Sequence, residues 1–143
     1  RLIIENSRTM LKATVNKDTK TVEQILHDIH NSEIPILQYN DENSLSCVIT
    51  LAYLSARDTY RVEREEKTGK GYADFTFHPR RKNDTAFIVE LKKDEVPEVA
   101  INQIREKEYI QKFKAENEGK EVLAVAICYD SKKKEHHCKI EEI

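Results

Sequence analysis

The sequence predicts an α/β fold, an α+β sandwich in which helices pack on one mixed β-sheet. Three strand-like runs follow one another between residues 59 and 92, which predicts antiparallel pairing. A helical segment at 98–117 separates the third run from an apolar, β-branched run at 121–130, which predicts a crossover to a parallel neighbour. The 143-residue length suits a single core, so we expect two leading helices followed by the order αβββαββ.

Helical periodicity dominates the N-terminal third of the chain. Segments 5–15 and 20–31 carry apolar residues at helical spacing. A connector at 34–39 contains a proline, so we expect it to be extended. An Asn or Asp N-cap at 40–41 begins a third helix, which we expect to end near Ala56.

The strands that follow are marked by alternation and bounded by glycine and proline. Pro97 suits the first turn of the crossover helix, and Gly119 suits the residue beyond its end. The fourth run is apolar throughout, as in strands buried on both faces of a sheet, and the fifth fits an edge strand. In chain order, the expected strands are TYRVEREE, YADFTF, FIVELK, EVLAVAICYD and EHHCKIEEI.

The amino-acid composition limits the classes of protein to which this chain can belong. Charged residues make up 35% of the chain and apolar residues 38%, and no apolar run reaches the roughly 20 residues of a membrane span. Three cysteines without a CxxC pair favour reduced thiols in a cytoplasmic protein. The net charge of −2 neither supports nor excludes a nucleic-acid partner. Because the first residue is Arg rather than Met, we expect the chain to be a piece of a longer protein.

The hairpin formed by the second and third strands has a register that burial selects. With the turn centred near Lys82, all the bulky apolar residues of both strands lie on one face in cross-strand pairs. The same register puts Asp74 opposite Glu90 on the other face, with Lys92 two residues further on. A slip of one residue would break this arrangement.

Two opposed carboxylates favour a cation between them, because a sheet gains nothing from like charges at paired positions. Asp74 and Glu90 supply the hard oxygen ligands that Mg²⁺ accepts, and Lys92 is placed to activate a water or to neutralise a phosphate. That combination suits metal-assisted phosphodiester hydrolysis. The alternative is a hairpin with one solvated face, on which Asp, Glu and Lys are ordinary residues.

Asp74, Glu90 and Lys92 form a D-x15-E-L-K pattern that resembles the PD-(D/E)XK nuclease signature, and the resemblance covers about residues 35–130. The run KTGKGYAD before the acid is similar to that of one subgroup, in which the nuclease domain follows an AAA-ATPase-like domain in bacterial proteins. The Glu42-Asn43 pair resembles the subgroup's helix start. A QI-x2-K-x-Y run in the crossover helix is similar as well. Ala73 in place of Pro is ordinary for the superfamily, whereas Tyr72 stands where many subgroup members have Arg.

The resemblance implies a restriction-endonuclease-like αβββαβ core at 35–143, with 1–34 as a helical lead-in, and an upstream ATPase-like domain as partner. It implies hydrolysis of nucleic acid, with DNA as the expected substrate, weak sequence specificity and Mg²⁺ or Mn²⁺ as cofactor. An inactive nuclease-like binding or regulatory module that serves the ATPase-like domain is the alternative.

The resemblance also assigns roles to individual residues. Asp74 and Glu90 hold the metal with help from Glu42, Lys92 activates water or stabilises charge, and Gln103 supports them. From their charge, we expect weaker contacts with nucleic acid from four basic residues, which are Arg80, Arg81, Lys93 and Lys107. Membrane partners are not expected, and the oligomeric state stays open.

Overall fold

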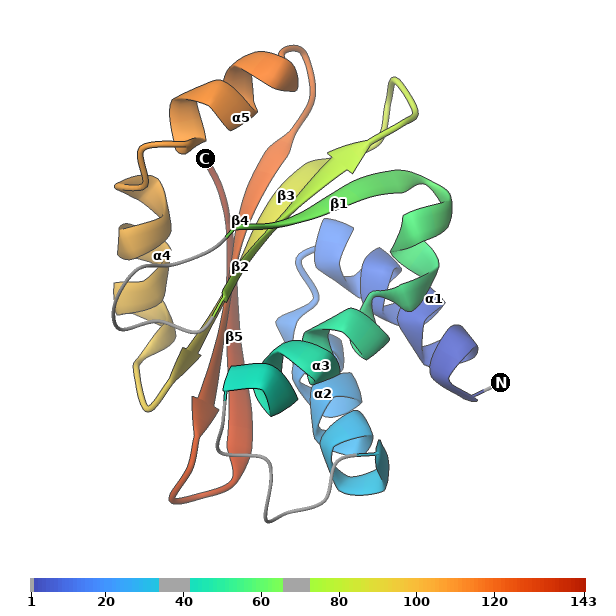
Figure 1. The fold of residues 1–143 in the computed structure, drawn as a ribbon, viewed down its shortest axis with the longest axis vertical. Helices are drawn as coiled ribbons and strands as arrows, with labels where there is room; N and C mark the ends of the chain where they lie inside the picture. The colour runs from blue at the N-terminus through green and yellow to red at the C-terminus, as the bar shows by residue number, and fades with distance from the viewer. Residues whose placement is uncertain (1, 34–41, 66–72) are drawn as a thin grey trace.

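The computed structural model describes residues 2–33, 42–65 and 73–143, and it describes side chains within 5–32, 46–64 and 75–143. A five-stranded sheet lies between two helical layers (Figure 1). The strands are β1 (Tyr60–Glu65), β2 (Ala73–Pro79), β3 (Ala86–Lys93), β4 (Val122–Asp130) and β5 (Glu135–Glu142). The helices are α1 (Leu2–Val15), α2 (Thr19–Glu33), α3 (Glu42–Ala52), the 3-10 helix η2 (Leu54–Asp58), α4 (Pro97–Arg105) and α5 (Ile110–Glu116).

The sheet is mixed, and its strands lie in chain order from β1 to β5. The pairs β1–β2, β2–β3 and β4–β5 are antiparallel, whereas β3 and β4 are parallel and are joined through α4 and α5. The predicted fold class and the parallel crossover are therefore confirmed. The hairpin register is confirmed as well, since Asp74 pairs with Glu90 and Phe77 with Phe87.

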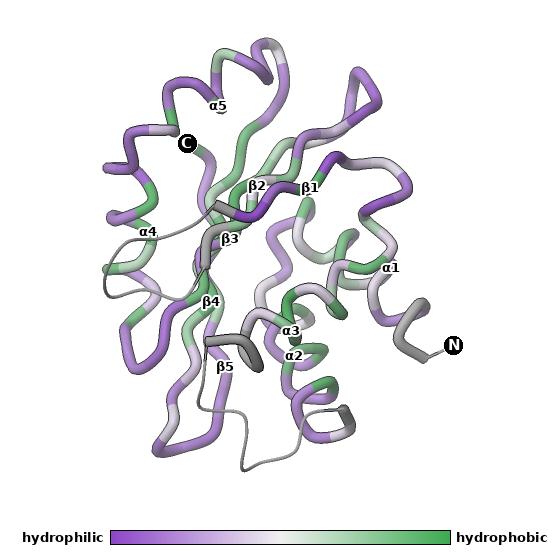
Figure 2. Tube along the Cα trace, viewed as in Figure 1, coloured by the Kyte–Doolittle hydropathy of each residue, from purple (hydrophilic) through white to green (hydrophobic). Residues whose placement is uncertain are grey.

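Alternate residues of the strands face two separate cores. Toward α1, α2 and α3, the strands present large side chains such as Phe77, Phe87 and Leu91. Toward α4 and α5, they present smaller ones such as Ala86 and Ala126. Figure 2 shows the hydrophobic residues concentrated on the strands and on the sides of the helices that meet them.

The two leading helices pack closely on the sheet. Met10 of α1 and Leu26 of α2 are fully buried in the same core as Phe77 and Phe87. The boundary predicted at residue 34 stays a prediction, and the connector expected at 34–39 lies outside the described residues.

The third helix ends earlier than the sequence predicted. The α-helical part stops at Ala52, and η2 replaces the turn that was expected to reach Ala56. Tyr53 leaves the helical conformation, at φ −107 and ψ 23, and its hydroxyl is 2.7 Å from that of Thr14. Burial of the Tyr53 ring against Phe77 and Phe87 therefore outweighs continuation of the helix.

The crossover contains two helices, whereas the sequence predicted one. The backbone N–H of Glu106 bonds to the carbonyls of Gln103 and Ile104 and closes α4. A continuous helix would turn Ile110 about 120° away from Ile104, because six residues at about 100° each leave that offset. The break lets both residues reach the core, while Val99 in the first turn of α4 is 39% exposed.

No helix in the described ranges combines the length and the apolar character that crossing a membrane requires.

Candidate active site

The even-numbered residues of β2 and β3 form one face of the hairpin, directed toward α4 and α5. In the register of the two strands, Asp74 lies directly opposite Glu90, and Lys92 follows on the same face. The side chain of Asp74 lies outside the described residues, as does that of Glu42 at the start of α3. The backbone pairing that the sequence predicted for the two acids is present.

Glu90 is the centre of a buried ion cluster. Its side chain has no solvent exposure, and its Oε1 atom is 3.6 Å from Nζ of Lys92 and 3.6 Å from Nζ of Lys107. The two lysines are themselves largely covered, with side-chain exposures of 14% and 28%. Two ammonium groups on one carboxylate oxygen offset the several kcal/mol that burying a carboxylate costs.

Lys107 reaches this cluster from the segment between α4 and α5. Its charge alone suggested a nucleic-acid contact. It lies just beyond the end of α4 at Arg105, and its Nζ atom is 3.6 Å from Oε1 of Glu90. In the sequence, this position was indicated by spacing, since Lys107 lies one helical turn beyond Gln103 in the predicted helix.

Gln103 places a buried amide oxygen in α4. Its Oε1 atom is buried and has no hydrogen-bond partner among the described residues. A buried amide without a partner costs on the order of 1–3 kcal/mol, so this oxygen is suited to accept from a group that the bare chain does not supply. Its predicted supporting role stays a prediction.

Cys128 on β4 pairs with Lys92 and is the sulfur nearest to the cluster in the sheet register. Burial raises the pKa of its thiol to about 12, and the carboxylates of Glu95 and Glu90 act in the same direction. The thiol is therefore protonated at neutral pH and is a poor metal ligand. At the position beside Lys92, the carboxylate of Glu90 is therefore a better metal ligand than the thiol of Cys128.

A small cavity of about 120 Å³ lies on the face of β2 to which residues 74, 76 and 78 belong by strand alternation. Thr76 and His78, which follow Asp74 at every second residue, line it together with Tyr109. The Thr76 hydroxyl is buried and finds no hydrogen-bond partner among the described residues. Sequence reasoning missed both residues, although the alternation D-x-T-x-H placed them on the face of Asp74.

His78 is neutral in this environment. Burial lowers the pKa of its imidazole, the nearby Arg61 lowers it further, and Glu116 opposes the shift. Nδ1 of the ring is 3.4 Å from Nδ2 of Asn117. A neutral imidazole can accept or donate a hydrogen bond, so His78 can orient a polar group in the cavity.

The two acids of β1 share the face of Asp74. Glu65 pairs with Asp74 in the register, and Glu63 pairs with Thr76 and lines the cavity. Glu63 forms an ion pair with Arg61. The side chain of Glu65 lies outside the described residues.

The remaining basic residues lie away from the acids. Arg80 is six residues from Asp74, about 20 Å at ~3.3 Å per residue along a strand, and Arg81 follows it in the β2–β3 turn. Lys93 points to the opposite face from Glu90 because neighbouring residues of a strand alternate. Their predicted nucleic-acid contacts stay predictions, and the chain brings none of the three to the cluster.

Among the described side chains, no group of three or more His, Cys, Asp and Glu residues is arranged to hold a metal ion. Asp74 and Glu42 are not part of that set. Glu90 is therefore the candidate metal ligand whose side chain the structure describes, and Asp74 is its partner in the strand pairing.

Comparison with protein families gives one match. The family model described as the PD-(D/E)XK nuclease superfamily matches residues 40–139, which include the hairpin and the crossover helices. Among curated proteins, none matches the chain significantly. The match covers well over half of the chain and includes Asp74, Glu90 and Lys92 in their expected strand context. The chain belongs to the PD-(D/E)XK nuclease superfamily.

Proposed function

We propose that this domain hydrolyses phosphodiester bonds of DNA in a reaction that depends on Mg²⁺ or Mn²⁺. The observation that carries the proposal is the fully buried Glu90 carboxylate, held by Lys92 and Lys107 and paired in the strands with Asp74. A surface hairpin gains no stability from burying an acid in this way. A nuclease needs an acid that is already in place, because positioning before the reaction lowers the barrier.

The residues fit a hard divalent cation. Carboxylate oxygens from Asp74 and Glu90 are the donors that Mg²⁺ and Mn²⁺ prefer, and the protonated thiol of Cys128 does not compete. Glu42, at the start of α3, is proposed to contribute a further oxygen. When bound, the cation would supply Lewis-acid stabilisation of the phosphoryl oxygens and a more acidic water.

The side chains of this chain have separate tasks in the proposed reaction. Lys92 orients the attacking water and offsets the negative charge that develops on the phosphate. Lys107 keeps Glu90 in position from the other side. Gln103, whose amide oxygen is buried and has no partner among the described residues, accepts a hydrogen bond from the attacking water and so restricts its orientation.

One observation favours a second candidate function. Lys92 and Lys107 already compensate the charge of Glu90, so the cluster is a complete ion triad without a metal. An inactive nuclease-like module, serving an ATPase-like domain in a longer chain, would keep such a triad for its packing. This candidate predicts a folded domain that neither binds Mn²⁺ at Glu90 nor cleaves nucleic acid.

The test is calorimetric titration of Mn²⁺ and Mg²⁺ together with cleavage of plasmid, single-stranded DNA and RNA. Glu90→Gln and Asp74→Asn should each remove metal binding and slow cleavage at least about a hundredfold, the range seen when a group that stabilises the transition state is lost. Glu118→Gln, which changes an exposed acid beyond α5, is the matched control and should behave as the parent.

Circular dichroism and melting curves show whether each variant is folded. If Glu90→Gln does not fold, Asp74→Asn alone provides the test. Metal binding that survives both substitutions would place the cation elsewhere. A folded parent that shows neither binding nor cleavage would reject the nuclease and favour the inactive module.

A further inference from the structure

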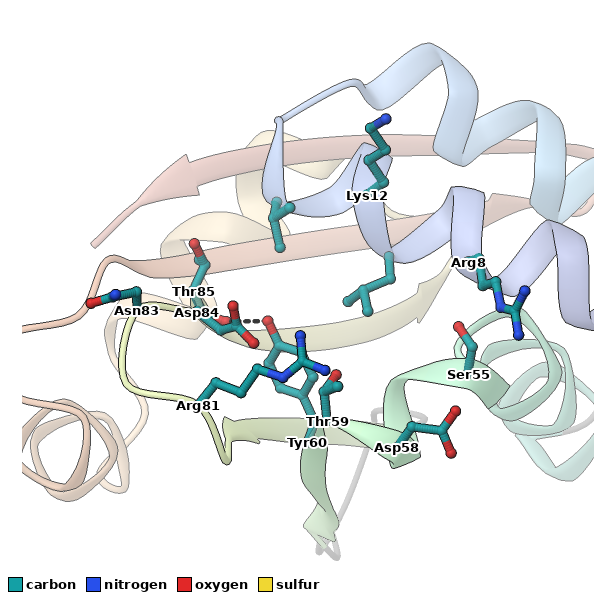
Figure 3. A pocket seen from close by; sticks show the side chains of 12 residues that line it. Arg8, Lys12, Ser55, Asp58, Thr59, Tyr60, Arg81, Asn83, Asp84 and Thr85 are labelled. Atoms are coloured by element: carbon teal, nitrogen blue, oxygen red, sulfur yellow. Dashed lines mark hydrogen bonds between the residues drawn. The ribbon is translucent and has the colours of Figure 1, made fainter.

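A large pocket lies at the opposite end of the β2–β3 hairpin from Glu90. Its volume is about 680 Å³, and its walls come from α1, from the η2–β1 junction and from the β2–β3 turn (Figure 3). Tyr60 in its wall belongs to the core toward α1, α2 and α3, so the pocket is on the other side of the sheet from the ion cluster. A volume of this size is typical of small-molecule sites.

Three cationic side chains from two walls line this pocket. Arg8 and Lys12 lie one turn apart on α1, and Arg81 comes from the β2–β3 turn on the other side of the hollow (Figure 3). Within the described ranges, none of the three forms an ion pair or a side-chain hydrogen bond. Guanidinium groups bind phosphate in a planar, two-pronged geometry, so this lining suits a phosphate.

Groups of other kinds complete the lining, and they include the carboxylates of Asp58 and Asp84 (Figure 3). Asp84 and Asn83, from the turn that carries Arg81, offer oxygens that accept hydrogen bonds from hydroxyl or amino groups. Leu11 and Val15 of α1 are half-buried and provide an apolar wall. The complement of this lining is a molecule with a phosphate, several hydrogen-bond donors and a flat apolar part.

The walls are held in place by hydrogen bonds that do not involve the cations. Ser55 of η2 donates its backbone N–H to Oγ of Ser7 on α1 at 3.0 Å. The Tyr60 hydroxyl donates to the carbonyl of Thr85 at 2.6 Å, and this bond is drawn in Figure 3. Since the walls are fixed before a ligand arrives, the remaining ordering cost of binding comes mainly from the exposed side chains of Arg8, Lys12 and Arg81.

We propose that this pocket binds a small phosphate ester of nucleoside monophosphate size. A nucleic-acid strand engaged in cleavage at Glu90 is a less suitable occupant. Arg81 is about 20 Å or more from Asp74 along β2, and the pocket lies on the opposite side of the sheet from Glu90. Binding would join α1 to the hairpin turn and stabilise the domain by mass action.

The experiment measures melting temperature and calorimetric affinity with inorganic phosphate, adenosine monophosphate, thymidine monophosphate, adenosine and a short oligothymidylate. The monophosphates should raise Tm, and adenosine, which lacks the phosphate, should not. Arg81→Gln and Arg8→Gln should each weaken binding about tenfold or more, as expected for loss of a charged hydrogen bond. Lys133→Gln, in the exposed β4–β5 turn, is the matched control and should leave affinity unchanged.

Three results would overturn the proposal. The first is no stabilisation by any monophosphate, and the second is stabilisation that both arginine variants retain. The third is tight binding of the oligonucleotide alone, which would make the pocket part of a nucleic-acid path. Glu90→Gln should bind monophosphates as the parent does, so a failed nuclease test and a failed pocket test remain distinguishable.

Discussion

The two faces of the β2–β3 hairpin differ in composition although they come from the same two strands. Toward α1, α2 and α3, the rings of Phe77 and Phe87 stack with centroids 4.3 Å apart and planes at 12°. Toward α4 and α5, the same strands carry Thr76 and the buried Glu90. The comparison shows that the odd-numbered residues form an aromatic core that stabilises the fold, whereas the even-numbered positions combine apolar residues such as Ile88 with buried polar groups.

Both sides of the sheet hold buried polar atoms without a hydrogen-bond partner among the described residues, and on the side of the aromatic face these include Oγ of Ser46 and of Ser55. On the aromatic face the rings pack against one another, since Tyr53 and Tyr60 also contact Phe77 and Phe87. On the other face, Gln103 leaves a buried oxygen without a hydrogen-bond partner among the described residues. The buried ion cluster around Glu90 is therefore what distinguishes the face toward α4 and α5.

The largest expected effect is on the aromatic face. Phe77→Ala should lower the free energy of unfolding by about 3–5 kcal/mol, because it removes a fully buried ring and leaves a cavity. Urea denaturation followed by circular dichroism measures this change. Phe77→Leu keeps most of the volume and is the matched control, with a smaller loss. If Phe77→Ala cost less than 1 kcal/mol (about the scale of a surface change), the assignment of stability to this face would be wrong.

A smaller effect comes from two histidines buried on this same side of the sheet. Burial lowers the pKa of His136 to about 3, and His30, His27 and His137 act in the same direction. The pKa of His30 is lowered as well, first by burial and then by His27 and Lys134. The His136 ring is therefore neutral in the folded chain near pH 6, and the His30 ring takes up its proton at a lower pH than in the unfolded chain, where histidines titrate near pH 6.5.

The sign of the pH dependence follows from this difference. Since the unfolded state binds more protons below pH 6.5, the free energy of unfolding should fall as pH decreases toward 3 and should be insensitive to these groups above 6.5. His136 alone should remove about 2 kcal/mol between pH 6.5 and 5.0, at ~1.4 kcal/mol per pH unit. Denaturation of the parent and of His136→Phe at both pH values measures this, and an equal pH slope in the two proteins would contradict it.

The sequence predicted the apolar face and the strand register more accurately than the ion cluster. Alternation sufficed to pair Asp74 with Glu90, because only one register buries all the bulky residues. Lys107 was assigned to nucleic acid, although its spacing of one helical turn from Gln103 favoured the same inward face, and its partner Glu90 lies on a strand that the spacing does not identify. Residues that a tertiary contact positions leave little local signal in the sequence.

The pocket at the β2–β3 turn was also not predicted from the sequence. Arg81 was visible as part of a basic turn, but Arg8 and Lys12 had no feature that linked them to it. Their meeting requires α1 to dock beside the turn, and a contact over such a sequence separation is not encoded in the periodicity of either segment. The separation also explains why the leading helices were interpreted as a lead-in segment.

The smallest expected effect separates two roles for Lys107. If it holds Glu90 in position, Lys107→Gln should lower kcat about tenfold and weaken Mn²⁺ binding, with KM for DNA little changed, as expected for loss of one contact to a charged group. If it contacts nucleic acid, as its charge suggested, KM should rise and the salt dependence of binding should decrease while Mn²⁺ affinity is kept. Lys112→Gln, an exposed lysine at the neighbouring cavity, is the matched control for the second outcome.

The double variant of Lys92 and Lys107 sharpens this prediction. Both ammonium groups lie 3.6 Å from the same oxygen of Glu90, so their effects on metal binding should be non-additive. Either lysine alone can hold the carboxylate partly in place, and loss of both should weaken metal binding more than the product of the single effects. Additive losses would mean that the two lysines act on different groups, and the face toward α4 and α5 would then contain two independent contacts instead of one cluster.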